Sequence, residues 1–80
     1  MPVPIVVPDL GTDRATVSLW FVQVGETVVV GDRLVEILLP AATFDVPSPH
    51  TGTLRERLAL PGDRVQPGHI LGTLDPDPDD

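Results

Sequence analysis

The sequence GETVVVGDRLVEIL, at residues 25–38, decides the fold because a second version of it follows as GDRVQPGHILGTLD, at residues 62–75. A spacing of three between its glycines and aliphatic residues could suggest a helical face, but the glycines and the run TVVV at residues 27–30 argue against a helix. We interpret each version as strand, glycine turn, short strand, second glycine turn and strand. The matching positions are Gly25, Glu26, Val28, Gly31, Leu34 and Ile37 in the first, and Gly62, Asp63, Val65, Gly68, Leu71 and Leu74 in the second.

The rest of the chain also has the pattern of strands separated by turns. Neither copy can bury a hydrophobic face alone, so the two are expected to pack together as a sandwich or flattened barrel. Prolines interrupt the alternating residues 3–7, which predicts a strand at a sheet edge. Gly31 and Gly68 are expected to adopt positive φ in equivalent turns. The sequence predicts an all-β fold with further strands at residues 15–24, 34–39, 43–46, 53–60 and 69–74.

Composition narrows the possible partners and chemistries. A net charge of −7 over 80 residues argues against binding to nucleic acid or to an anionic membrane. The absence of cysteine excludes disulfides, thiolate metal sites and cysteine nucleophiles. No apolar run approaches the ~18–20 residues of a membrane span, and the N-terminal residues show no signal or transit peptide. We therefore expect a cytoplasmic domain at residues 1–75, followed by an acidic Pro/Asp tail or the start of a linker at residues 76–80.

Three short motifs resemble one known family. They are Val7-Pro8-Asp9-Leu10-Gly11, Val24-Gly25-Glu26 and Val46-Pro47-Ser48-Pro49. Together they resemble the lipoyl domain of the acyltransferase (E2) component of 2-oxoacid dehydrogenase complexes, and the match runs from about residue 5 to residue 74. The resemblance implies a flattened eight-stranded barrel of two quasi-symmetric four-stranded sheets.

The resemblance also says where the chemistry of such a domain would lie. In the family, a hairpin between the two repeats displays Asp-Lys-Ala, and lipoic acid is attached to the lysine through an amide. Counting from Glu36 and from residues 46–49 places Pro40-Ala41-Ala42 at that site, after Leu39, so Ala41 stands at the position of the lipoyl-lysine. The chain has no lysine at all. We therefore expect no functional cofactor-binding residue and no bound lipoic acid.

The apolar residues 38–42 differ from the family at several neighbouring positions, which favours natural divergence over the engineered loss of one lysine. Two interpretations of this loop stay open: an exposed contact surface, or a loop that packs back against the barrel.

Other residues that could carry chemistry lack supporting partners in the sequence. The histidines have no metal-ligand spacing, the serines have no His–Asp pattern, and the carboxylates are expected to be solvated. Trp20 is expected to be a partly buried packing residue, and Arg55 and Arg57 beside Glu56 suggest a surface row of ion pairs. We expect no catalytic and no metal-binding residue. The residues considered are His50, His69, Ser18, Ser48, Asp9, Asp13, Asp77, Asp79 and Asp80.

Two functional hypotheses follow. In the first, the chain is a degenerate, non-lipoylated structural or docking module, with other subunits of a 2-oxoacid dehydrogenase complex as partners and with no enzymatic activity of its own. In the second, it derives from a swinging-arm lipoyl or biotinyl carrier whose lysine was lost or removed. Biotin carriers usually show Met-Lys-Met, which is absent. The barrel-sandwich module of an efflux adaptor is disfavoured because the 37-residue offset leaves no room for a long helical hairpin. The isolated domain is expected to be monomeric, and the activity of a parent chain stays open.

Overall fold

The computed structural model describes residues 1–78, and this range folds into strands and turns without a helix. The expected tail at residues 76–80 therefore lies partly outside the described residues, at Asp79 and Asp80. The eight strands are β1 (Val3–Val6), β2 (Ala15–Trp20), β3 (Thr27–Val28), β4 (Arg33–Leu38), β5 (Thr43–Pro47), β6 (Gly52–Arg57), β7 (Arg64–Val65) and β8 (Ile70–Pro76).

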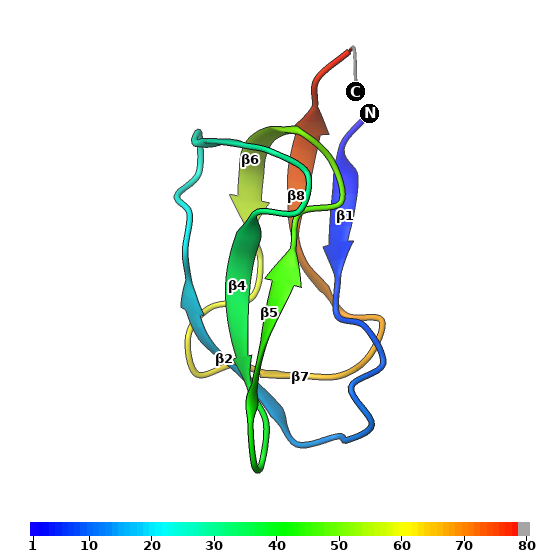
Figure 1. Cartoon of the computed structure of the whole chain (residues 1–80), viewed down its shortest axis with the longest axis vertical. Coiled ribbons are helices and arrows are strands. Elements are labelled where there is room, and N and C mark those ends of the chain that lie inside the picture. Colours follow the sequence, from blue (N-terminus) through cyan, green and yellow to red (C-terminus); the bar gives the residue numbers. More distant parts are fainter. Residues whose placement is uncertain (79–80) are drawn as a thin grey trace.

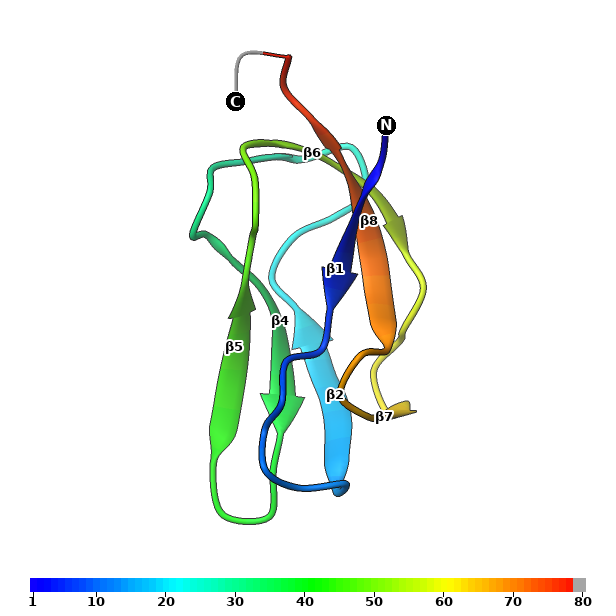
Figure 2. The ribbon, with the colours of Figure 1, turned by 90° about the vertical axis from the view of Figure 1, so that its right-hand side faces the viewer.

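The strands form two antiparallel four-stranded sheets that face each other across the core (Figures 1 and 2). One sheet has the order β1-β8-β6-β3 and the other has the order β5-β4-β2-β7. If four is added to each strand number, with β1 counted as following β8, the first order becomes the second. The predicted flattened barrel of two quasi-symmetric sheets is confirmed, and β1 lies at a sheet edge as its prolines indicate.

The core lies between the two sheets and is made of aliphatic side chains from both. Buried positions alternate with half-buried ones in the first four residues of β2, as expected for a strand with one face on the core. Leu10, Trp20, Leu39 and Phe44 are partly buried against this core. The buried set is Ile5, Val7, Ala15, Val17, Val22, Val28, Leu34, Val35, Ile37, Val46, Leu54, Ala59, Val65, Leu71 and Leu74.

Four turns of one design connect the strands within the two repeats. Each has glycine at its third position with φ between 88° and 93°, which is the conformation of a type II turn. In each, the fourth residue donates its N–H to the carbonyl of the first, and its side chain accepts the first residue's N–H. The expected positive φ of Gly31 and Gly68 is confirmed. The turns span residues 23–26, 29–32, 60–63 and 66–69.

Two strands end three or four residues earlier than the sequence indicates, and the strand predicted at 34–39 ends one residue earlier, at Leu38. The segments predicted at 15–24 and 53–60 stop at Trp20 and Arg57. After β6, the N–H groups of Leu58 and Ala59 both donate to the carbonyl of Leu71, so the chain leaves the regular ladder before it reaches the next turn. Apolar residues continue past that point, which is why composition alone extends the strand.

Trp20 joins the two sheets. Its Nε1–H donates to the carbonyl of Ala59 at 2.7 Å, and its ring lies close to Gly72, where a Cβ would come within 3.1 Å of the indole and would collide with the backbone oxygen of Glu56. A glycine at position 72 is therefore required by this close approach. The expectation that Trp20 is a packing residue agrees with these contacts.

The turn glycines yield a first test. A Cβ on Gly31 or Gly68 would meet no atom within 4 Å, so the cost of alanine there is conformational rather than steric. We expect Gly31→Ala and Gly68→Ala each to lower the free energy of unfolding by about 1 kcal/mol or more, measured by urea denaturation. The two losses should add in the double variant because the turns are separate. Unchanged stability in both single variants would contradict the symmetry of the turns.

A second test uses the second position of the turns, where Pro61 and Pro67 stand in the later repeat and Val24 and Val30 stand in the earlier one. Proline is favoured there because its φ is already that of a type II turn. Within the described residues the N–H of Val24 has no partner, so we expect Val24→Pro to stabilise the fold by about 0.4–1 kcal/mol.

Val30→Pro is the matched control for this test. The N–H of Val30 donates to Thr51 Oγ1 at 3.0 Å, and proline would remove that bond. We expect this variant to gain nothing or to lose stability. Equal stabilisation by both substitutions would show that the hydrogen bond to Thr51 contributes nothing.

Candidate functional site

The β4–β5 hairpin projects from one end of the long axis of the molecule, opposite Met1 and the last described residues (Figure 1). Its strands are in register from Glu36 opposite Asp45 to Leu38 opposite Thr43. Beyond them, Leu39 N–H donates to the carbonyl of Ala42 at 2.8 Å. This bond leaves Pro40 and Ala41 as the two residues at the tip.

The tip is exposed and carries no reactive group. Pro40, Ala41 and Ala42 are exposed, and no non-glycine residue of residues 1–78 has positive φ, so the turn does not use the mirror-image geometry of type I′ hairpins. A pyrrolidine ring and two methyl groups offer no amine, thiol or hydroxyl. The tip presents apolar surface only.

Neither interpretation of the apolar loop holds for all of it. Leu38 is 43% exposed, whereas Leu39 is half-buried and packs against the core. The alternation of side chains along the strand explains the division, because successive residues point to opposite faces. Leu39 therefore anchors the tip, and Leu38 contributes to the surface.

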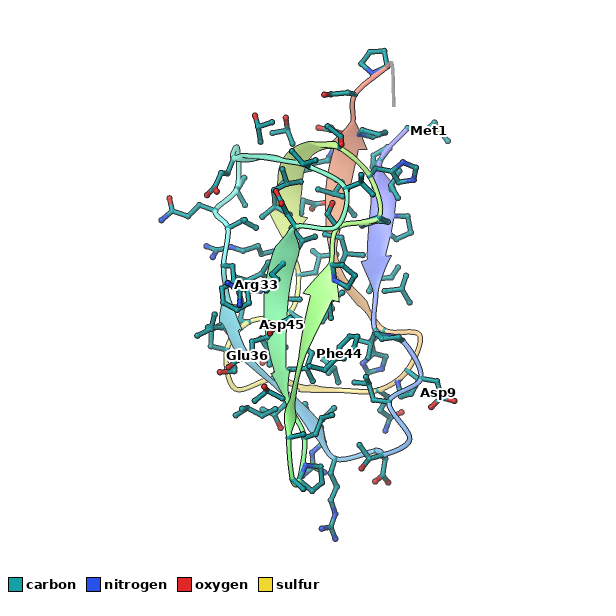
Figure 3. All side chains as sticks on the ribbon, in the orientation of Figure 1. Met1, Asp9, Arg33, Glu36, Phe44 and Asp45 are labelled. Atoms are coloured by element: carbon teal, nitrogen blue, oxygen red, sulfur yellow. The ribbon has the colours of Figure 1, made fainter. Side chains whose placement is uncertain are left out.

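Charged and aromatic residues occupy the strands that support the hairpin. Arg33 Nη1 lies 3.4 Å from Asp45 Oδ2 (Figure 3). The guanidinium of Arg33 also lies 4.7 Å from the centre of the Phe21 ring. Asp45 Oδ1 is buried and has no hydrogen-bond partner within the described part of the chain. Glu36 lies directly opposite Asp45 in the ladder. Arg33 thus compensates a carboxylate that faces a second acid across the strands.

The remaining residues singled out in the sequence have structural roles or lie apart. Ser48 is buried, and its Oγ donates to the carbonyl of His50 at 2.6 Å, so it is part of a turn rather than a nucleophile. His69 Nδ1 accepts the N–H of Gln66. Asp9 Oδ1 accepts the N–H of Gly11. No group of three potential metal ligands occurs among residues 1–78.

The expected row of ion pairs around Glu56 takes another form. Arg55 pairs with Asp75 at 3.3 Å, and Glu56 accepts a hydrogen bond from Thr73 Oγ1 at 3.1 Å. Neither arginine pairs with Glu56, because adjacent residues of a strand point to opposite faces. Asp75 and Thr73 belong to β8, so the row joins β6 to β8.

Two surface hollows are not evident from the sequence. One is lined by Asp13, Arg14, Thr16 and Arg64, near the start of β2. The other is an apolar groove of about 400 Å³ between β1 and β5. Both hollows are formed by segments that lie far apart in the chain, so no local sequence pattern predicts them. The apolar groove is lined by Pro4, Ile5, Val6, Pro8, Phe44, Val46, Pro47, Ser48 and Pro49.

The described residues contain no helix long and apolar enough to span a membrane.

Comparison with known proteins gives consistent results. Residues 3–74 match the Biotin_lipoyl family, described as "Biotin-requiring enzyme". A dihydrolipoyllysine-residue succinyltransferase component of the 2-oxoglutarate dehydrogenase complex from Bartonella vinsonii is 40% identical over 94% of this chain. A lipoamide acyltransferase component of the branched-chain alpha-keto acid dehydrogenase complex from Pseudomonas aeruginosa is 41% identical over 84% of it. The chain spans 19% and 15% of the length of these two relatives.

A solved structure has the same fold. The solution structure of the lipoyl domain of the 2-oxoglutarate dehydrogenase complex from Azotobacter vinelandii superimposes with a TM-score of 0.69 and 25% sequence identity. The match covers 89% of this chain and 95% of that domain. The similarity therefore extends over nearly the whole of both domains.

Proposed function

This chain belongs to the family of biotinyl and lipoyl domains, and we propose that it is a lipoyl-type domain without a lipoyl-lysine that acts as a structural or docking module. It is related to the acyltransferase components of 2-oxoacid dehydrogenase complexes. A lipoyl domain is a carrier module and is not itself catalytic. We propose that this module no longer carries the group and that its partners are other subunits of such a complex.

One observation carries the proposal: the exposed tip of the β4–β5 hairpin consists of Pro40 and Ala41, in a chain without any lysine. Lipoic acid is attached through an amide, which needs a side-chain amine, and a long flexible stem lets the arm move. The methyl group of Ala41 supplies neither. The residues present at the tip do not fit a covalently attached lipoyl or biotinyl group.

The hairpin nevertheless keeps the support that a displayed residue needs. Five residue pairs hold β4 to β5, and Leu39 packs against the core beneath the tip. These contacts involve neither side chain of the turn. The shape of the hairpin and the identity of its tip residue are therefore separable, which supports a domain that has lost its chemistry and has kept its scaffold.

The test restores the amine. We expect the natural chain to gain no lipoyl mass when it is incubated with a lipoate ligase, lipoate and ATP, as followed by intact-protein mass spectrometry. Ala41→Lys should be lipoylated at least in part. Pro40→Asp with Ala41→Lys should be lipoylated more fully, because the double change removes the stiff proline before the lysine and restores the family's Asp-Lys pair.

Two control variants show whether the position matters. Arg57→Lys puts an exposed amine on β6, and Ala42→Lys puts one a single residue beyond the tip. Neither should gain the lipoyl mass. If the lysine at position 41 stays unmodified in a folded protein, or if the controls are modified equally, Ala41 does not stand at the lipoyl-lysine position.

A further inference from the structure

We propose that Arg14, Thr16 and Arg64 form a docking point for a carboxylate side chain of an acidic protein partner, with Leu38 beside them as the apolar part of the same contact. The inference deepens the proposed docking role and rests on it. It assigns that role to a surface at the base of the hairpin rather than to the tip.

The strand register brings these residues into one row. Thr16 of β2 lies opposite Leu38 of β4 on one side and opposite Arg64 of β7 on the other. Arg14 precedes β2 by one residue, and its side chain lines the same hollow as those of Thr16 and Arg64. Diagonal neighbours in an antiparallel sheet are about 7–8 Å apart, within reach of two long side chains. One oxyanion can therefore contact both guanidinium groups.

The chain has a net charge of −7. This hollow nevertheless attracts an anion, because its two arginines are not compensated by carboxylates. Two other arginines are compensated, since Arg33 pairs with Asp45 and Arg55 pairs with Asp75. Within residues 1–78, neither Arg14 nor Arg64 has a carboxylate within ion-pair distance. Two uncompensated guanidinium groups that face one hollow repel each other, and a carboxylate between them relieves the repulsion. Planar guanidinium also matches a carboxylate in bidentate geometry.

Neighbouring acids limit how such an anion can bind. Asp13 also lines the hollow, and it pairs with neither arginine. Asp63 precedes Arg64, but its Oδ2 accepts the N–H of Leu60 at 2.8 Å and is held in the turn. Asp13 therefore opposes an incoming carboxylate from one side. Neutralising Asp13 should strengthen binding.

The apolar neighbour indicates a protein rather than a free anion. Leu38 is 43% exposed and lies next to Thr16 across the ladder, and the exposed tip continues the apolar surface. Protein interfaces combine such an apolar contact with arginine. A free inorganic anion would use the arginines and leave Leu38 in water. A segment that alternates acidic and aliphatic residues would cover both.

The test follows backbone amides of the whole chain by ¹H–¹⁵N NMR during titration with a blocked peptide of alternating leucine and glutamate. We expect shifts at Arg14, Thr16, Leu38 and Arg64 that weaken as salt is added. The same peptide with glutamine in place of glutamate should cause none of them. Arg14→Gln and Arg64→Gln should each weaken binding about two- to fivefold, the effect of one exposed ion pair, and Asp13→Asn should strengthen it.

The controls distinguish binding at this site from non-specific electrostatic binding of the peptide. They also keep the test independent of the test of the proposed function. Arg57→Gln removes an exposed arginine from the other sheet and should leave binding unchanged. Leu38→Ser should lower the affinity for the peptide and leave any affinity for inorganic phosphate unchanged. Absent shifts, binding of the peptide to Arg64→Gln as tight as to the natural chain, or binding of phosphate as tight as that of the peptide would each overturn the inference. Because the titration uses the natural tip, its outcome is independent of the lipoylation of Ala41→Lys.

Discussion

The hydrogen bonds between the two halves of the chain hold the fold together, because each half bonds its first glycine turn to a strand of the other. Gly25 N–H donates to Leu54 O and Gly62 N–H donates to Val17 O, while Leu54 N–H and Val17 N–H donate back to the carbonyls of Glu26 and Asp63. Polar backbone groups left unpaired in a buried position are costly. Neither half can satisfy its own turns, so the two copies fold as one unit and the sheets face each other.

The hydrogen bonds between the two halves also indicate which residues can be replaced without loss of the fold. In the sheet order β5-β4-β2-β7, strands β4 and β5 are joined by the hairpin; in the other sheet, their equivalents β8 and β1 pair without any connection. The pairing of β8 with β1 therefore forms without a hairpin tip between the two strands. The cross-half hydrogen bonds involve neither Pro40 nor Ala41. A site that the fold does not require can lose its chemistry without loss of stability.

Sequence reasoning succeeded where the signal repeats and failed where it depends on register. The 37-residue repeat predicts the symmetry and the positive φ of Gly31 and Gly68, because glycine spacing and turn conformation are locally coupled. Residue composition places the ends of two strands several residues too late; after Arg57 the chain leaves the ladder because the N–H groups of Leu58 and Ala59 both donate to the carbonyl of Leu71 in β8. The row from Leu38 through Thr16 to Arg64 arises from pairing between distant strands, and no local pattern encodes it. The assignment of Ala41 to the lipoyl-lysine position stays a prediction, because it depends on comparison with other sequences.

The two halves share one strand order and one design of glycine turn, so the differences between their surfaces are informative. Arg33 stacks on Phe21 and pairs with Asp45 in one half; the positions related to Phe21 and Arg33 by the 37-residue offset are Leu58 and Ile70, which are 54% and 51% exposed. Arg33 with its two partners, the hairpin tip and the hollow of Arg14 and Arg64 belong to the sheet β5-β4-β2-β7 or to its connections, whereas the pair of Arg55 and Asp75 lies on the other sheet. The repeat explains the backbone that both halves share. It does not explain why the hairpin tip and the hollow of Arg14 and Arg64 lie on the same sheet. The residues that depart from the repeat are those on which partner recognition can depend, and the hairpin tip and the hollow of Arg14 and Arg64 both lie on the sheet β5-β4-β2-β7 or its connections.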